Sequence, residues 1–392
     1  MIVGRRVAIV CLTALPVFLQ GDCVWGQTPR AQNPAYAQMD REAVDYRGPG
    51  RATSSDITSK TATIGILLPL QGANAEQGRQ LMKAAQQAIA DENQRGPLPD
   101  GRPFSLAVKN ETGNWGQSST EMMRLITEDE SLALIIGSNG NLAHQAEQIA
   151  NKLGISIVTL ASDATTTQIN IPWIFRVVPS DEQQADAIAQ GIYGRNKSSK
   201  VLLISTMDHD GRAGKLAFTR AARAIGADAP VELDLDPEMV DTGQAEQKLR
   251  DSRPDAVVFW TGSLVFEELL DTVESARSVR LIYACEKAAL PMLSNPAASS
   301  ANTAVRVPII GAELGQAGMP GQIYNAVRLI AAAIRTAGLN RARVRDALAR
   351  STMQTAGGSS PVFDGAGNLL AKPQLAPVSS SQQPDRESSS VN

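Results

Sequence analysis

The chain has 392 residues, which at roughly 100–200 residues per domain predicts about two domains and excludes a single small module. Hydrophobic residues make up 43% and charged residues 20%, so most of the chain can bury a core, and a disordered or fibrous protein is excluded. The formal net charge of −3 argues against the broad positive field that non-specific nucleic-acid binding needs, so no nucleic-acid partner is expected.

Histidine and cysteine are scarce in this chain. The chain has two histidines and three cysteines (Cys11, Cys23 and Cys285). These are too few soft ligands for a Cys/His zinc site. Neither histidine belongs to a recognisable metal motif. We therefore expect no metal and no cofactor, although a site built from oxygen ligands stays open.

The first residues have the pattern of an export signal. Two arginines precede the apolar run Val7–Leu19, which is long enough for a signal-peptide core and too short to span a bilayer. Val24 and Gly26 suit cleavage before Gln27. Residues 1–26 are therefore predicted to be a signal peptide, and the protein to be periplasmic or secreted.

Lipidation is the alternative for the same segment. Cys23 would be the acylated residue after Leu19–Asp22, although Asp22 departs from the small residue that a lipobox prefers. With cleavage before Gln27 the mature chain keeps only Cys285, so no internal disulfide is possible. No later run reaches the length of about 18 apolar residues that a transmembrane helix needs, so membrane attachment is expected only through a lipid at Cys23.

Strand-like runs alternate with helical patterns along the middle of the chain, which is typical of βαβ units. Residues 27–61 and 372–392 lack apolar periodicity and are predicted to be a flexible linker and a disordered tail. The first set of predicted strands comprises 64–68, 104–108, 132–136, 155–159 and 174–178, with amphipathic helices following the first and third.

The alternation of strand-like and helical patterns then repeats and predicts a second α/β unit of similar size. Its predicted strands are 201–204, 231–235, 256–260, 281–284 and 305–310, and its predicted helices are 214–225, 245–251 and 266–276. After this unit, the sequence predicts helices at 324–337 and 341–350 and a short strand at 361–363. The fold class is thus α/β, with two Rossmann-like lobes of parallel strands. Lobe I is assigned to 62–178 and 311–356, and lobe II to 179–310 and 357–371.

Two parallel sheets joined in this way place a ligand cleft between the carboxyl ends of their strands. Three crossings between the lobes are expected near 178–181, 310–312 and 357–361, where the strand rhythm changes sheet and Pro or Gly interrupts the chain. Crossings of this kind act as hinges for rigid-body closure on a ligand.

Several motifs, taken in order, resemble those of one family. The motifs are Ile64–Gly72 with the following Gly78, Ile136–Asn141, Thr159–Thr165, Phe175–Asp181, Arg253–Trp260, Tyr324–Val327, Val344–Leu348 and Phe363–Asn368. Their order and spacing resemble the periplasmic type I substrate-binding proteins, the leucine-binding-protein-like receptors for branched-chain amino acids and amides that serve ABC importers. The resemblance covers about Thr63 to Asn368 and implies the periplasmic binding protein-like I fold, whose three-stranded hinge joins the two lobes.

The resemblance also implies ligand contacts in lobe I. Asn141 lies at the start of the helix after the third strand, where free N–H groups and the helix dipole favour an anion such as a ligand carboxylate. Ala161, Ser162 and Asp163 fall where the family holds the ligand's α-ammonium. Asn141 could instead be a plain N-cap, and Asp163 a solvated turn aspartate.

Further contacts are implied in lobe II. Glu286 occupies the position of the family's ammonium-binding glutamate, which would place it across the cleft from Asp163; the alternative is an exposed charge at a strand end. Trp260 at the end of a strand could wall the pocket, or could serve core packing. Asp210 lies in a strand-to-helix loop that faces the cleft, beside His209, where an N-cap cluster is the alternative.

No catalytic constellation is visible: the chain has neither a Walker A motif nor a G-x-S-x-G nucleophile elbow. The sequence therefore predicts no enzyme. It predicts an extracytoplasmic solute-binding protein that captures a small polar amine-bearing ligand, an amino acid or amide, for an ABC permease. A ligand-sensing or protein-docking regulator of the cell envelope on the same fold stays open, as does a hydrolase that uses Asp163 or Glu286.

Overall fold

A computed structural model describes residues 50, 57–112, 115–169, 171–194, 196–294, 304–310, 318–355 and 358–378. The predicted signal peptide and its cleavage site, with Cys23, lie outside these residues. No helix within the described ranges combines the length and the apolar character needed to cross a membrane.

The first lobe is built on a five-stranded parallel sheet in the order β2-β1-β3-β4-β5. Its strands are β1 (Ala62–Leu68), β2 (Phe104–Asn110), β3 (Ala133–Ile136), β4 (Ser156–Thr159) and β5 (Ile174–Arg176), and its first helices are α1 (Ala75–Gln94), α2 (Trp115–Thr127) and α3 (Gly140–Leu153). Every residue of β1 is buried, as expected for a parallel strand that helices cover on both faces.

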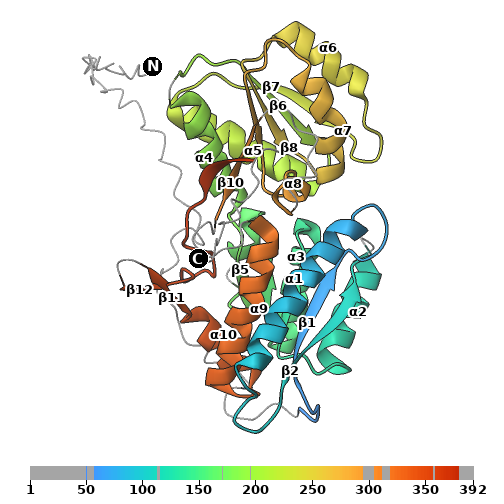
Figure 1. The fold of residues 1–392 in the computed structure, drawn as a ribbon, viewed down its shortest axis with the longest axis vertical. Coiled ribbons are helices and arrows are strands. Elements are labelled where there is room, and N and C mark those ends of the chain that lie inside the picture. The colour runs from blue at the N-terminus through green and yellow to red at the C-terminus, as the bar shows by residue number, and fades with distance from the viewer. Residues whose placement is uncertain are drawn as a thin grey trace, which may run out of the picture. The chain divides into compact units, whose positions relative to one another are not determined.

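Two late helices complete the first lobe. They are α9 (Gly318–Ala337) and α10 (Arg341–Ala349), and α9 lies beside α1 although more than 200 residues separate the two (Figure 1). Ile323, Val327 and Ile330 of α9 share one buried cluster with Leu81 and Ala85 of α1. The apolar stripe predicted on α1 is thus buried against α9.

The second lobe contains a six-stranded sheet in the order β13-β10-β9-β8-β6-β7. Its strands are β6 (Val201–Thr206), β7 (Val231–Leu235), β8 (Ala256–Trp260), β9 (Leu281–Ala284), β10 (Val305–Ile309) and β13 (Gln374–Val378), and its helices are α4 (Asp181–Tyr193), α5 (His209–Ile225), α6 (Thr242–Ser252), α7 (Ser263–Glu274) and α8 (Leu290–Ser294). Only β13 runs antiparallel to its neighbour in this sheet.

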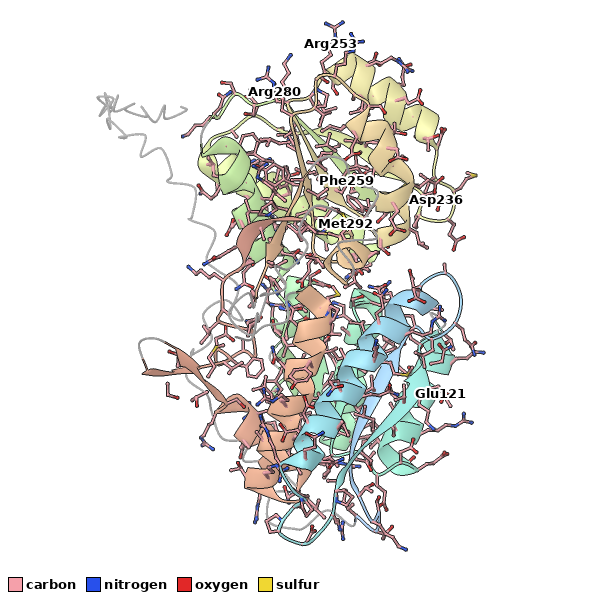
Figure 2. The ribbon with its side chains drawn as sticks, in the orientation of Figure 1. Glu121, Asp236, Arg253, Phe259, Arg280 and Met292 are labelled. Carbon is pink, nitrogen blue, oxygen red and sulfur yellow. The ribbon has the colours of Figure 1, made fainter. Side chains whose placement is uncertain are left out.

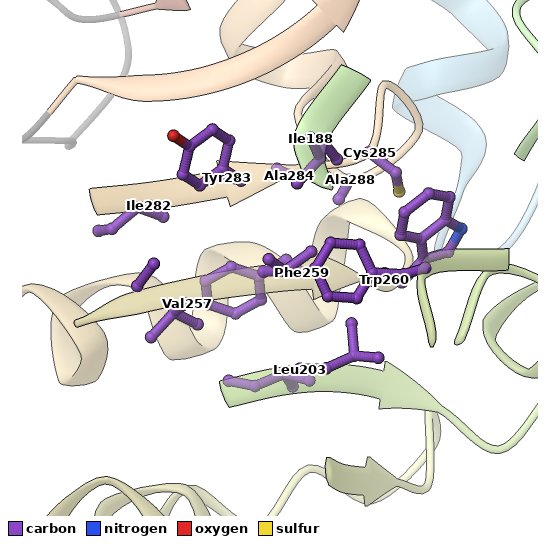
Figure 3. Packing of buried hydrophobic residues seen from close by; sticks show 14 of the residues in the cluster. Ile188, Leu203, Val257, Phe259, Trp260, Ile282, Tyr283, Ala284, Cys285 and Ala288 are labelled. Atoms are coloured by element: carbon purple, nitrogen blue, oxygen red, sulfur yellow. The ribbon is translucent and has the colours of Figure 1, made fainter. Parts of the chain in front are cut away.

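Aromatic residues of this sheet form the centre of the second core. Phe259 of β8 is paired with Ile204 of β6 and Ala284 of β9 (Figure 3), and it meets Phe266 of α7 edge to face, with 5.0 Å between the ring centroids. Cys285, at the end of β9, belongs to the same cluster as a buried free thiol, and burial raises its pKa to about 12. Charged side chains such as Arg253 and Arg280 point outward from this lobe (Figure 2).

The C-terminal part of the chain differs from the prediction. The segment expected to be a disordered tail includes β13, which pairs with β10 from Val305↔Val378 to Ile309↔Gln374. Pro377 obscured this strand in the sequence, and proline is tolerated here because β13 is an edge strand. The prediction for 372–392 is therefore wrong for Gln374–Val378, and the residues beyond 378 lie outside the described part.

The preceding segment, 357–371, was assigned to lobe II, and this is also wrong. Val362, Phe363 and Leu369 belong to the first lobe's core, and the ring of Phe363 lies 5.1 Å from that of Phe175 in β5. A small hairpin of β11 (Thr352–Thr355) and β12 (Gly358–Pro361) comes just before them. The third crossing between the lobes consequently lies between residues 371 and 374, and not at 357–361.

We predict that β13 contributes measurably to stability. A chain that ends after Lys372 loses the buried Val378 and the half-buried Leu375, each of which contributes up to roughly 1.5–3 kcal/mol when fully buried. Its free energy of unfolding in urea should fall by about 2–4 kcal/mol. A chain that ends after Val378 is the control and should keep full stability; equal stability of the two truncated chains would contradict the assignment.

Candidate functional site

The carboxyl ends of the two sheets are joined at the N-terminus of α3. Asn139 caps this helix, since its side chain accepts a hydrogen bond from Leu142 N at 3.2 Å. The next N–H, that of Gly140, donates to Asp210 Oδ1 at 3.1 Å, and Asp210 belongs to α5 of the second lobe. A Cβ atom on residue 140 would lie 2.5 Å from Asp210 Oδ1, so this approach requires glycine. A carboxylate thus occupies the positive end of α3.

A lysine neutralises that carboxylate. Lys287, which follows β9, donates from Nζ to Asp210 Oδ2. Burial would lower the pKa of Lys287, but the charge of Asp210 offsets this effect and the pKa is raised above its usual value. Burial raises the pKa of Glu111, after β2, while a hydrogen bond with Asn139 and the charge of Lys287 act in the opposite direction. The loops after β2, β3, β6 and β9 therefore meet in one polar network.

A second contact between the lobes centres on Asp163 in the loop after β4. Its Oδ2 atom lies 2.9 Å from His144 Nε2 of α3 and 2.6 Å from His209 Nε2 of α5. Hydrogen bonds that His144 donates to Asp163 and Glu147 raise the pKa of His144 to about 10. Asp163 is only 3% exposed, so the solvated-turn alternative is wrong. Burial alone would raise the pKa of Asp163, but the two histidines hold it well below its usual range.

Ser162 and Trp260 meet at the first residue of α4. The N–H of Asp181 donates to Ser162 O at 2.8 Å, and the indole Nε1 of Trp260 donates to Asp181 Oδ1 at 3.3 Å. Burial raises the pKa of Asp181 to about 7. Trp260 is buried at the end of β8 (Figure 3), where its indole covers Gly214 so closely that any Cβ there would overlap it. Ala161, also buried, donates its N–H to Thr159 Oγ1 at 3.0 Å.

A buried guanidinium supports these loops from the first lobe. Arg176, the last residue of β5, donates from Nη1 to Asp163 O at 2.7 Å and from Nη2 to Asn368 Oδ1. Burial lowers the pKa of Arg176, and the charges of Asp181, Asp163 and Asp364 oppose this effect. One cation therefore holds the loop after β4 and the turn at 364–368 together.

Glu286 has partners of its own, and these do not include Asp163. The side chain is 0% exposed, so the alternative of an exposed strand-end charge is wrong. Its backbone N–H donates to Gln184 Oε1 at 2.9 Å, and its Oε2 atom accepts from Gln322 Nε2 of α9 at 3.4 Å. The Oε1 atoms of Glu286 and Gln322 have no hydrogen-bond partner among the described residues. Burial raises the pKa of Glu286 to about 8.

The structure thus groups some of the predicted residues and separates others. Asp163 and Asp210 each contact the opposite lobe, whereas the side chain of Asn141 is exposed and the N-cap is Asn139. Asp208 is the N-cap of α5, so the N-cap alternative holds for Asp208 and fails for Asp210.

Sequence reasoning missed several residues of this region, among them His144, Asp181, Lys287 and, as a partner of Asp163, His209. The signal that could have found them is their place in loops or first helical turns after strand ends, which parallel topology collects at one edge of each sheet.

Comparison with known proteins identifies the chain's relatives. The family model described as "Periplasmic binding protein" matches residues 61–276. An "Amino acid binding protein" of Pseudomonas aeruginosa is 28% identical over 159 residues, which are 40% of this chain and 42% of that protein. The chain spans about half the length of the curated relatives that it matches.

Solved structures share the fold at low identity. A solute-binding protein of an ABC transporter from R. palustris, in complex with benzoate, has a TM-score of 0.67 and 15% identity over 81% of this chain and 96% of that one. The branched-chain amino acid binding protein LivJ of Streptococcus pneumoniae, in complex with isoleucine, has a TM-score of 0.66 and 15% identity over 81% of this chain and 99% of that one. These likenesses confirm the predicted fold class of two α/β lobes.

We predict that Glu286 makes stability depend on pH. In the unfolded chain it loses its proton near its usual pKa of 4.5, whereas the folded chain keeps the proton to about pH 8. The folded state therefore binds more protons in this window, so stability falls as pH rises from about 4.5 to 8. Each unit of pKa difference corresponds to about 1.4 kcal/mol. Glu286→Gln, which resembles the protonated acid, should remove this loss.

Urea unfolding at pH 5 and at pH 8.5 measures the effect. Wild type and Glu286→Gln should differ little at pH 5, and the variant should be more stable at pH 8.5 by up to a few kcal/mol. Glu268→Gln, an exposed acid on α7, serves as the control and should follow wild type at both pH values. A variant that is less stable than wild type at pH 8.5 would show that Glu286 is charged and paired in the fold.

Proposed function

Because the chain belongs to the periplasmic binding protein family, a family of binding proteins rather than enzymes, we propose that it captures a small polar solute between its lobes for an ABC importer. The proposed solute is an amino acid or amide, with an amine at one end and a carboxylate or amide oxygen at the other. The predicted export signal and the family both favour an extracytoplasmic protein, with an ABC permease as its partner.

The observation that carries this proposal is the carboxylate of Asp210 at the N-terminus of α3. Asp210 Oδ1 accepts the hydrogen bond from Gly140 N that a solute carboxylate would accept in its place. Isoleucine and benzoate, the ligands of the two structurally similar proteins, both carry a carboxylate. We infer that solute binding displaces Asp210 and leaves Lys287 to face the solute's negative charge.

The proposed ligand contacts come from both lobes. Asn141, Ala161, Ser162 and Asp163 would contribute from the first lobe, and Trp260 and Glu286 from the second, while Asp210 would give up its place at Gly140 N to the solute. Asp163 is the proposed partner for the amine, because its pKa is low and its carboxylate is buried between the lobes. Trp260 would supply an apolar wall, since its indole is fixed by Gly214 and Asp181.

A second function is favoured by the same contacts. The side chains of Asp210 and His209 contact the first lobe directly. This arrangement suits a ligand-sensing or protein-docking regulator of the cell envelope, whose closed form is held by its own residues and signals to a partner.

A thermal-shift screen tests the transport proposal. Amino acids, amides, polyamines and aromatic carboxylates are added to the mature chain, and one class should raise the melting temperature in proportion to concentration. A solute at 100 times its Kd should stabilise the fold by about 2.7 kcal/mol. An unchanged melting temperature with all four classes would contradict solute capture and favour the regulator.

We further predict that Asp210→Ala binds the solute more tightly than wild type. The substitution removes the carboxylate that competes for Gly140 N, and one charge-assisted hydrogen bond of about 1.5–3 kcal/mol corresponds to roughly 10-fold to 150-fold in affinity. Calorimetry with the solute from the screen measures the change. Asp236→Asn, in the loop after β7 and outside this network, is the control; weaker binding by Asp210→Ala would mean that Asp210 itself holds the solute.

A further inference from the structure

The chain's only two histidines converge on one oxygen atom, although they come from different lobes. His144 Nε2 of α3 and His209 Nε2 of α5 lie 2.9 Å and 2.6 Å from Asp163 Oδ2. The three atoms that these residues offer as ligands lie within 4.8 Å of one another, so small shifts of the side chains would bring all three to a single metal ion.

Neighbouring groups orient two of these three side chains. Glu147, which is 3% exposed, lies with Oε2 at 3.0 Å from His144 Nδ1 and so fixes the ring with Nε2 facing Asp163. Asp163 Oδ1 accepts from Thr165 N at 2.9 Å and from Thr165 Oγ1 at 2.8 Å, which leaves Oδ2 toward the histidines. A carboxylate behind a ligating imidazole is the usual outer partner of a metal site.

The cluster is also accessible. The side chains of His144 and His209 are 30% and 29% exposed, whereas that of Asp163 is 3% exposed. A metal ion could therefore enter from solvent on the histidine side and keep a water molecule as its fourth ligand. Two imidazoles and one carboxylate suit zinc and its neighbours in the first transition row better than they suit calcium or magnesium.

We propose that His144, Asp163 and His209 form a binding site for a divalent transition metal such as zinc. The metal replaces the protons shared between the imidazoles and the carboxylate, and it ties α3 and the loop after β4 to α5. The histidine count argued against a Cys/His zinc site; the fold supplies the missing ligand from a carboxylate. Asp163 is also the proposed partner of the solute's amine, so the metal and the amine would compete for its carboxylate.

Metal titration of the tag-free mature chain tests the site, because a polyhistidine tag would add competing ligands. Calorimetry with Zn²⁺ should give one site per chain at pH 7.5, and Co²⁺ should develop the visible absorption of a metal bound to imidazole and carboxylate. Lys152→Gln, an exposed change on the same helix as His144, should bind like wild type. His144→Gln and His209→Gln should each weaken binding at least about tenfold, and Glu147→Gln about 10–100-fold.

Three outcomes would overturn the proposal. The first is that wild type shows no saturable binding of Zn²⁺, and the second is that wild type and both histidine variants bind equally. The third is that His144→Gln loses binding while His209→Gln keeps it, because the metal would then be bound by one lobe alone. Circular dichroism melts establish that each variant is folded.

Small-angle scattering tests the bridge between the lobes independently. Zn²⁺ should lower the radius of gyration of wild type and leave that of His209→Gln unchanged; an unchanged wild type would overturn the bridge. The solute screen, run in the presence of a chelator, keeps this test separate from that of the proposed function.

Discussion

The burial of the Arg176 guanidinium is the constraint on which the candidate site depends. A buried cation is tolerated only where hydrogen bonds and opposite charges replace its water. Arg176 obtains these from the carbonyl of Asp163, the side chain of Asn368 and the surrounding carboxylates of Asp181 and Asp364. The loop after β4, the start of α4 and the turn at 364–368 are therefore held together where the chain passes between the lobes. Loss of any one partner would leave charge uncompensated in the interior.

The two lobes meet through polar contacts and through apolar packing at α8, where the buried Leu290 belongs to the core cluster of the first lobe. Among the polar contacts, Glu286 accepts from Gln322 of α9, Asp210 accepts from the N-terminus of α3, and His209 meets Asp163. The contacts of Asp210 and His209 are directional and charge-assisted, so each is strong only at one geometry and weakens steeply as the lobes separate. Asp163 and His209 are also among the proposed ligands of the metal ion, and Asp163 is the proposed partner of the solute's amine.

Most of the fold could be predicted from the sequence because its strands are short apolar runs between amphipathic helices. All five strands of the first sheet and five of the second lie at the predicted places, each within a few residues. β13 could not be predicted, because its pairing with β10 joins residues about 70 positions apart and Pro377 hides its pattern. The burial of Val362 and Phe363 against the first lobe likewise depends on tertiary contacts.

The candidate site was less predictable, for a physical reason. Parallel topology indicates which loops converge, so Asp163, Trp260 and Asp210 could be named from the ends of their strands. It does not indicate which way a side chain points across the gap. Glu286 follows β9 as expected, yet its carboxyl group meets Gln322, while the next residue, Lys287, reaches Asp210. The side chains of these two consecutive residues point in different directions, and the type of charge alone does not indicate which of them crosses to Asp210.

The thiol of Cys285 has a consequence for folding outside the cytoplasm. It is buried in the second core, and its raised pKa leaves almost no thiolate, the species that attacks disulfides. Once folded, the chain is therefore a poor substrate for oxidants and for thiol exchange with other exported proteins. The thiol is therefore reactive only before the second lobe folds over β9, and folding itself protects it.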